Sequence, residues 1–232
     1  MPRDAPGALR VLVPMKPLDD AKSRLRAAVP SMELRAAVLS MLDRVVRAAS
    51  DALGPGACVV FGGDGLVRAV VAEGGGRWEP DPGNTLNASL WRAMQDAYAD
   101  GADATLFLPA DLPMIEGADV LELARASDGY TRPVGVEATA DGGTNALLVP
   151  AAQAFAPRLG EDSFAKHREA ADAQGTPLVA LDAPRLAFDV DSVEDYAWAK
   201  AEVGGFASSI DRWQAWLQAA SANSPAGAQP TP

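Results

Sequence analysis

"VLVPMKPLDDAKSRL", residues 11–25, joins a short apolar run to a loop rich in cations. The run is continuous and ends at a proline, which is typical of a strand buried on both faces of a sheet. The loop after it carries Lys16, Lys22 and Arg24. Such a loop is either a solvated turn or a binding site for a ligand with several negative charges. Three cations close together at the end of a strand give the second interpretation, a polyphosphate site, equal standing with the first.

Similar apolar runs recur along the chain, and segments with helical periodicity separate them. This alternation predicts a three-layer α/β/α sandwich around a mostly parallel sheet. The predicted strands are 9–14, 57–61, 104–109, 133–136, 146–149 and 178–181, and the predicted helices are 31–50, 64–72, 84–99, 117–126, 163–173, 192–202 and 209–218.

The 232 residues of the chain suit one domain, which we place at 9–218. We expect disorder in residues 1–8 and in the Ala-, Pro- and Ser-rich residues 219–232. In the last predicted helix, Trp213 and Trp216 lie three residues apart and are expected to dock on the body of the domain. A subunit contact in a homodimer is the alternative.

The bulk composition excludes several classes of function. A net charge of −11 opposes binding to nucleic acid or to an anionic membrane. The single cysteine, Cys58, excludes an intramolecular disulfide and a multi-cysteine zinc site, and its apolar neighbours predict a buried position. The start of the chain has no apolar signal core, and no run reaches membrane-spanning length. The sequence therefore predicts a cytoplasmic protein.

A carboxylate follows the apolar run in "TLFLPADLPMI", residues 105–115. Pro109 and Pro113 bracket Asp111, so strand pairing should end there. Ligands gather at the carboxyl ends of parallel strands, and Mg²⁺ favours one or two carboxylates together with substrate phosphates. We predict that Asp111 binds a metal; a turn or a helix cap is the alternative.

Two further carboxylates lie in "AFDVDSVEDYAWAK", residues 187–200. Asp189 and Asp191 alternate with a valine, so in an extended segment both point to one side. They repel each other unless a metal or another cation is present. Asp191 can instead cap the helix that follows. We therefore predict Asp189 as the second metal ligand and keep Asp191 as a further candidate ligand.

Two loops have the composition of anion-binding sites, "DGGTNALLVP" (141–150) and "RLGEDSFAKH" (158–167). Consecutive glycines let backbone N–H groups approach a ligand, and Thr144 adds a hydroxyl. Ser163 opens a predicted helix, whose N-terminus attracts phosphate or carboxylate. Plain capping of that helix is the alternative role for Ser163.

The sequence shows no arrangement for covalent catalysis. Its sole histidine, His167, is expected to be a satisfied surface or edge residue. The chain has no Gly-x-x-x-x-Gly-Lys-Ser/Thr pattern, which argues against a P-loop NTPase. Cations, separated carboxylates and glycine-lined loops suit direct phosphoryl or nucleotidyl transfer, in which positioning and charge neutralisation provide the catalysis.

Six stretches together resemble, in this order, the 2-phospho-L-lactate and phosphoenolpyruvate guanylyltransferases of coenzyme F-420 biosynthesis. The resemblance covers roughly residues 9 to 202, and it implies a nucleotidyltransferase fold of the nucleotide-diphospho-sugar transferase-like type. It also implies Mg²⁺-dependent transfer of GMP from GTP onto a small phospho-acid, with release of pyrophosphate. The stretches are "VPMKPLDDAKSRL", "LNASL", "LPADLPMI", "GGTNALLVP", "GEDSFAKH" and "FDVDSVED".

The same resemblance implies a role for each matching position. The basic loop would hold the triphosphate and assist catalysis, two carboxylates would bind Mg²⁺, and the glycine-lined loops would contact the phospho-acid. These positions are Lys16, Lys22 and Arg24 for GTP, Asn87 near the nucleotide, Asp111 and Asp189 for Mg²⁺, and Thr144, Gly160 and Ser163 for the phospho-acid.

Other functions stay open at this stage. The chain could be a nucleotidyltransferase acting on a sugar phosphate or a molybdopterin, although it lacks the glycine-rich start typical of many such enzymes. A non-catalytic GTP-binding domain and a metal-dependent glycosyltransferase are further alternatives. Among phospho-acids we favour phosphoenolpyruvate over 2-phospho-L-lactate, because the Ala- and Arg-rich composition is typical of bacteria.

Overall fold

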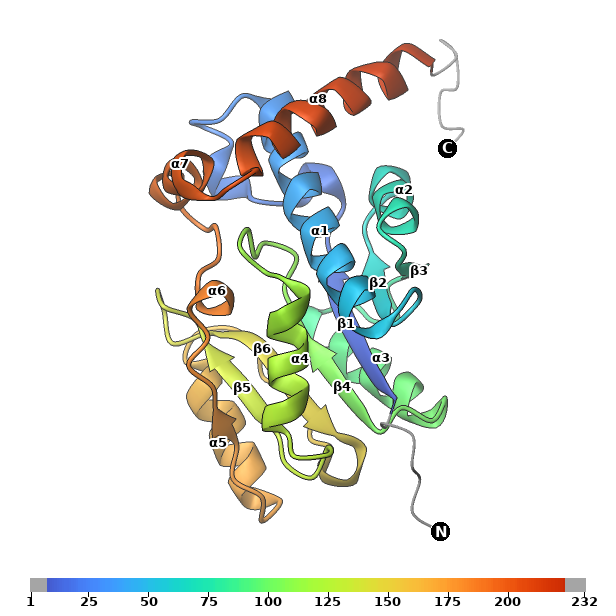
Figure 1. Cartoon of the computed structure of the whole chain (residues 1–232), viewed down its shortest axis with the longest axis vertical. Helices are drawn as coiled ribbons and strands as arrows, with labels where there is room; N and C mark the ends of the chain where they lie inside the picture. The colour runs from blue at the N-terminus through green and yellow to red at the C-terminus, as the bar shows by residue number, and fades with distance from the viewer. Residues whose placement is uncertain (1–7, 224–232) are drawn as a thin grey trace.

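A computed structural model describes residues 8–223 of the chain. They form one seven-stranded sheet with helices on both faces (Figure 1). The strands are β1 (Leu9–Met15), β2 (Cys58–Gly62), β3 (Arg77–Glu79), β4 (Ala104–Phe107), β5 (Val134–Glu137), β6 (Thr144–Pro150) and β7 (Val179–Ala180). The helices are α1 (Ser31–Leu53), α2 (Gly65–Glu73), α3 (Leu86–Ala99), α4 (Gly117–Ala126), α5 (Ser163–Ala173), α6 (Pro184–Ala187), α7 (Val193–Glu202) and α8 (Phe206–Asn223).

The strand order is β3-β2-β1-β4-β6-β5-β7. β6 runs antiparallel to both of its neighbours, and all other pairs are parallel. The predicted mostly parallel sheet is therefore confirmed. Strand β3 was missed because its sequence, Arg-Trp-Glu, has no apolar run; it is a short, largely exposed strand at the edge of the sheet.

Alternate side chains of β1 enter two separate hydrophobic cores. Val11 and Val13 pack with residues of α1, α2 and α4 on one face of the sheet. Leu12 packs with residues of α3 and α5 on the other face. Successive side chains of a strand point to opposite faces, so a continuous apolar run serves both layers. This confirms the predicted sandwich (Figure 1).

The last helix, α8, lies against α1 at one end of the molecule (Figure 1). It buries a stripe at helical spacing, formed by Phe206, Ile210, Trp213 and Leu217. Trp213 is 1% exposed, and its ring meets that of Trp216 edge to face with centroids 5.3 Å apart. Docking of this segment on the body of the domain is confirmed.

Two predicted boundaries need correction. Helix α8 runs from Phe206 to Asn223, so the disorder expected from residue 219 is wrong for 219–223. Alanine is the strongest helix former, and the hydroxyl of Ser221 donates to the carbonyl of Leu217, so the helix continues. Ala8 donates its backbone N–H to Asp103, and the other terminal residues that we expected to be disordered lie outside the described part.

Among residues 8–223, no helix is both long and apolar enough to cross a membrane.

Truncating Trp213 tests the docking of α8. We expect Trp213→Ala to lower the free energy of unfolding by about 3–5 kcal/mol, because it removes a fully buried aromatic side chain. Trp198→Ala is the control, since that side chain is 45% exposed, and it should cost about 1 kcal/mol or less. Urea unfolding of both variants measures the difference. A loss of about 1 kcal/mol or less for Trp213→Ala would contradict the docking of α8 on the core.

Candidate active site

The cation-rich loop and Asp111 meet at one edge of the sheet. β1 and β4 are parallel neighbours, so the loops that follow them leave from the same side. The loop after β1 is anchored by the buried side chains of Leu18 and Leu25. The N–H of Leu18 also donates to Asp64, whose carboxylate caps α2. The loop is therefore fixed to the protein rather than freely solvated.

Three carboxylates converge at this edge, those of Asp111, Asp189 and Asp191; we call them the carboxylate cluster. One oxygen from each lies within 4.8 Å of the others. The backbone N–H of Val190 donates to the carbonyl of Asp111 at 3.3 Å, which holds the segment of Asp189 and Asp191 beside the loop after β4. The structure thus brings together all three carboxylates that the sequence singled out.

Lys22 lies inside this cluster. Its ammonium group is 2.5 Å from Oδ2 of Asp111 and 2.6 Å from Oδ1 of Asp191. Burial alone would lower the pKa of Lys22, but the charges and hydrogen bonds of the two aspartates raise it above the ordinary value. Lys22 is therefore a cation that compensates part of the cluster's negative charge.

Asp189 has a neutral partner, Asn145 on β6. The amide of Asn145 donates to Oδ1 of Asp189 at 3.0 Å and to the carbonyl of Ala187 at 3.2 Å. Burial, followed by the charge of Asp111, raises the pKa of Asp189 to about 6. Sequence reasoning missed Asn145; its place directly after Thr144 on a buried strand was the available signal.

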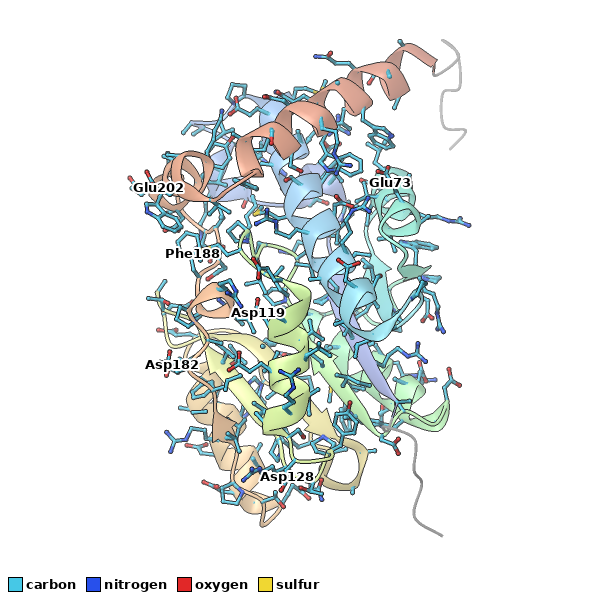
Figure 2. The ribbon with its side chains drawn as sticks, in the orientation of Figure 1. Glu73, Asp119, Asp128, Asp182, Phe188 and Glu202 are labelled. Atoms are coloured by element: carbon cyan, nitrogen blue, oxygen red, sulfur yellow. The ribbon has the colours of Figure 1, made fainter. Side chains whose placement is uncertain are left out.

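The segment that leads to Asp189 is held on both sides. Arg185 on α6 forms a bidentate pair with Asp119 on α4, with its closest contact at 2.6 Å. Phe188 packs edge to face on Trp198 of α7, with ring centroids 4.8 Å apart. Figure 2 labels Asp119 on α4 and Phe188 on the segment itself. The carboxylate cluster is thereby assembled on a supported scaffold rather than on a free loop.

The chemistry of the cluster fits a divalent cation such as Mg²⁺. Oδ1 of Asp111 is buried and has no hydrogen-bond partner in the described part of the chain. A buried carboxylate oxygen without a partner is costly unless a ligand uses it. Mg²⁺ prefers hard oxygen donors, and three carboxylates within reach of one point supply them.

The two glycine-lined loops also meet. The N–H of Phe164 donates to the carbonyl of Gly142 at 3.1 Å, and Oγ1 of Thr144 is 3.0 Å from Oγ of Ser163. Gly160 adopts a φ of +119°, which only glycine accommodates readily. Thr144 and Ser163 form what we call the hydroxyl pair, which is almost fully buried.

Ser163 does not cap helix α5. The residue at the N-cap is Asp162, without a side-chain cap bond, and Ser163 is the first residue of the helix. Its hydroxyl contacts Thr144 instead. The capping alternative for Ser163 is therefore wrong. The same holds for Asp191, because the helix after it is capped by Ser192, which forms a capping box with Asp195.

His167 is fully buried, so the expectation of a surface or edge histidine is wrong. Its Nδ1 is 3.0 Å from Oγ1 of Thr144, and its Nε2 is 2.8 Å from the backbone N of Arg158. The polar flanking residues suggested exposure, but His167 lies on the inner face of α5, one turn after the buried Ser163 and Phe164.

Three other predicted residues stand apart from these contacts. Lys16 and Arg24 are exposed and form no ion pair with any of residues 8–223. Asn87 pairs its side-chain amide with the backbone of Leu159, accepting at 2.7 Å and donating at 3.2 Å. Asn87 thus holds the 158–162 loop, and its contact with a nucleotide stays a prediction.

The fold is that of the nucleotide-diphospho-sugar transferase-like proteins. A crystal structure from Desulfovibrio desulfuricans G20, described as a candidate nucleotide-diphospho-sugar transferase, superposes with a TM-score of 0.71 at 17% identity, covering 92% of this chain and 96% of that one. A cytidylyltransferase from Leptospira borgpetersenii superposes with a TM-score of 0.54 at 11% identity, covering 97% and 100%.

The family follows from sequence comparison. Residues 9–198 match the family model "Guanylyl transferase CofC like". The chain is 38% identical to the phosphoenolpyruvate guanylyltransferase of Rubrobacter xylanophilus, covering 83% of this chain and 94% of that protein. It is also 38% identical to the 3-phospho-D-glycerate guanylyltransferase of Phenylobacterium zucineum, covering 75% and 82%. The chain belongs to the CofC-like guanylyltransferase family.

Replacing Asp189 tests the carboxylate cluster. At neutral pH Asp189 is ionised, and because its pKa is raised in the folded protein, its charge costs stability. We expect Asp189→Asn to raise the free energy of unfolding of the metal-free protein by about 1 kcal/mol. The measurement is the midpoint of thermal unfolding of the wild type and the variant, once in EDTA and once in Mg²⁺.

Mg²⁺ should raise the midpoint of the wild type more than that of Asp189→Asn, because the variant has lost a ligand. Asp182→Asn is the control, an exposed carboxylate on the same segment, and should behave like the wild type. An Asp189→Asn variant that is less stable in EDTA, with an undiminished response to Mg²⁺, would contradict the assignment.

Proposed function

We propose that this protein transfers GMP from GTP to the phosphate of a small phospho-acid, releasing pyrophosphate, as a step of coenzyme F-420 biosynthesis. The observation that carries the proposal is the carboxylate cluster, with its unpartnered Asp111 oxygen, at the edge of the sheet that the cation-rich loop also reaches. The names of the relatives support the choice of guanylyl transfer.

Asp111 and Asp189 would hold Mg²⁺, and Asp191 lies close enough to serve as a third ligand. When bound, Mg²⁺ supplies charge neutralisation for the phosphates that gather here. Asn145 keeps Asp189 oriented toward the other two carboxylates. These side chains therefore act by placement, which is the main contribution of a protein to this type of reaction.

Lys16, Lys22 and Arg24 are assigned to the triphosphate of GTP and to the departing pyrophosphate. Lys16 and Arg24 are exposed in the loop after β1, where no described side chain neutralises them. Lys22 contacts Asp111 directly and so links the cations to the carboxylate cluster. A cation there opposes the negative charge that builds up on the leaving oxygen.

Thr144, Gly160 and Ser163 are assigned to the phospho-acid. A phosphate oxygen of the acid attacks the α-phosphorus of GTP, a new P–O bond forms, and the bond to the β-phosphate oxygen breaks. The electron pair leaves with pyrophosphate. The attacking phosphate is already largely ionised at neutral pH, so the reaction requires no strong general base on the protein.

Phosphoenolpyruvate is the favoured acid, ahead of 2-phospho-L-lactate. Relatives from Rubrobacter xylanophilus and Roseiflexus castenholzii are named phosphoenolpyruvate guanylyltransferases. The relative from Phenylobacterium zucineum is named for 3-phospho-D-glycerate at the same 38% identity as the Rubrobacter protein, so that acid belongs in the test.

The decisive experiment measures pyrophosphate release from GTP and Mg²⁺ with each of the three acids offered separately. We expect release with phosphoenolpyruvate. Release only with 2-phospho-L-lactate or 3-phosphoglycerate would correct the substrate but keep the reaction. GTP binding without release for any acid would refute the proposal, because a GTP-binding domain or a glycosyltransferase would behave in that way.

The variant Asp111→Asn tests the metal assignment within this assay. We expect turnover to fall by about 10²-fold or more, because the substitution removes a charged metal ligand at the reacting phosphates. Circular dichroism should show an unchanged fold. Asp182→Asn, at an exposed position, should keep full activity. Near-full activity of Asp111→Asn at saturating Mg²⁺ would contradict the assignment.

A further inference from the structure

His167 is the centre of a buried hydrogen-bonded chain. One ring nitrogen, Nε2, is 2.8 Å from the backbone N of Arg158, and the other, Nδ1, is 3.0 Å from Oγ1 of Thr144. Thr144 in turn is 3.0 Å from Oγ of Ser163. The ring and the hydroxyl pair are each less than a tenth exposed, so these contacts are not exchanged for bulk water.

The backbone decides which ring nitrogen carries the proton. The N–H of Arg158 can only donate, so Nε2 must accept and must be unprotonated. In a neutral ring the proton then sits on Nδ1, which donates to Oγ1 of Thr144. Burial, together with the charges of Arg158 and Lys166, lowers the pKa of His167 to about 4, so the ring is neutral near pH 7.

This tautomer sets the polarity of the hydroxyl pair. Each hydroxyl has one proton to donate and can accept two hydrogen bonds. If Thr144 accepts from His167, the contact between Thr144 and Ser163 uses only one of the two hydroxyl protons. The other proton remains available. With the opposite tautomer, Thr144 would donate to the ring and Ser163 to Thr144, and no proton would remain.

We propose that His167 is a positioning residue for the phospho-acid: by accepting from Arg158 and donating to Thr144, it leaves the hydroxyl pair with one free proton to donate to an anionic oxygen of that substrate. The proposal rests on the function proposed above, in which Thr144 and Ser163 bind the acid. It adds a residue that acts on the acid without touching it.

The same ring also contacts the second part of that site. Arg158 lies two residues before Gly160, so His167 joins the 158–162 loop to the hydroxyl pair. The next residue, Leu159, is held by Asn87 from α3. The loop therefore has a second anchor that does not depend on His167.

Two substitutions of the same size separate donation to Thr144 from acceptance. In His167→Asn, the side-chain N–H₂ can take the place of Nδ1 and still donate to Thr144. In His167→Asp, a carboxylate takes the same place and can only accept, so Thr144 donates to it and no hydroxyl proton remains for the acid. Both variants lose the contact with Arg158, so they are matched controls for each other.

Steady-state kinetics gives the first test. We expect His167→Asp to raise the KM for the phospho-acid by about 10-fold or more over that of His167→Asn, because the hydroxyl pair loses its hydrogen bond to the charged acid. The KM for GTP should stay unchanged. His167→Asn should keep the KM for the acid within about 3-fold of the wild type, since its donor to Thr144 is retained. Equal effects in both variants, or a parallel rise in the KM for GTP, would overturn the proposal.

Nitrogen NMR of the histidine gives the second test, which does not depend on activity. His167 is the only histidine in the sequence, so tag-free protein labelled with ¹⁵N-histidine reports one imidazole ring. We expect a protonated Nδ1 and an unprotonated Nε2 near pH 7. A protonated Nε2 would overturn the proposal whatever the enzyme does. A wild type that shows the expected tautomer but releases no pyrophosphate would instead refute the proposed function and, with it, the role toward the acid.

Discussion

Negative charge concentrated at one edge of the sheet is the constraint on which the rest of the site depends. Three carboxylates within 4.8 Å of one another repel, and the folded protein must compensate them. In the protein alone, Lys22 supplies one positive charge, and burial raises the pKa of Asp189 to about 6. A divalent cation would satisfy the cluster more fully, and Oδ1 of Asp111 is free to bind one.

The scaffold explains how such a cluster is kept in place. Arg44 on α1 donates to the carbonyls of Pro113 and Gly204, so one side chain connects the loop of Asp111 with the junction between α7 and α8. Arg212 on α8 pairs with Asp43 on α1 at 2.6 Å. Helix α8, which lies beyond the region matched by the family model, thus braces the helix that supports the Asp111 loop.

Much of the fold could be predicted from the sequence because its strongest signals are local. A strand that is buried on both faces must be apolar throughout, so β1, β2, β4 and β6 were recognisable. The edge strand β3 and the four-residue helix α6 lack such a signal, because their sequences have no extended apolar pattern. The end of α8 was misjudged because alanine-rich sequence is compatible with both a helix and a disordered tail.

The site was predictable where chemistry is carried by charge. A carboxylate among apolar neighbours is unusual unless it has a partner or a ligand. This is why the sequence singles out Asp111, Asp189 and Asp191, and the structure places them together. Asn145 and His167 act through contacts with residues 44 and 9 positions away, which no local pattern encodes. The polar neighbours of His167 on α5 even pointed to the wrong environment.

Phosphorus NMR of a reaction mixture tests the central claim most directly, because it observes the bond that the protein is proposed to make. With GTP, Mg²⁺ and phosphoenolpyruvate, the account predicts two mutually coupled signals from an unsymmetrical pyrophosphate diester, together with the signal of free pyrophosphate. Signals of GDP and inorganic phosphate, or of GTP that stays unchanged with all three acids, would contradict it.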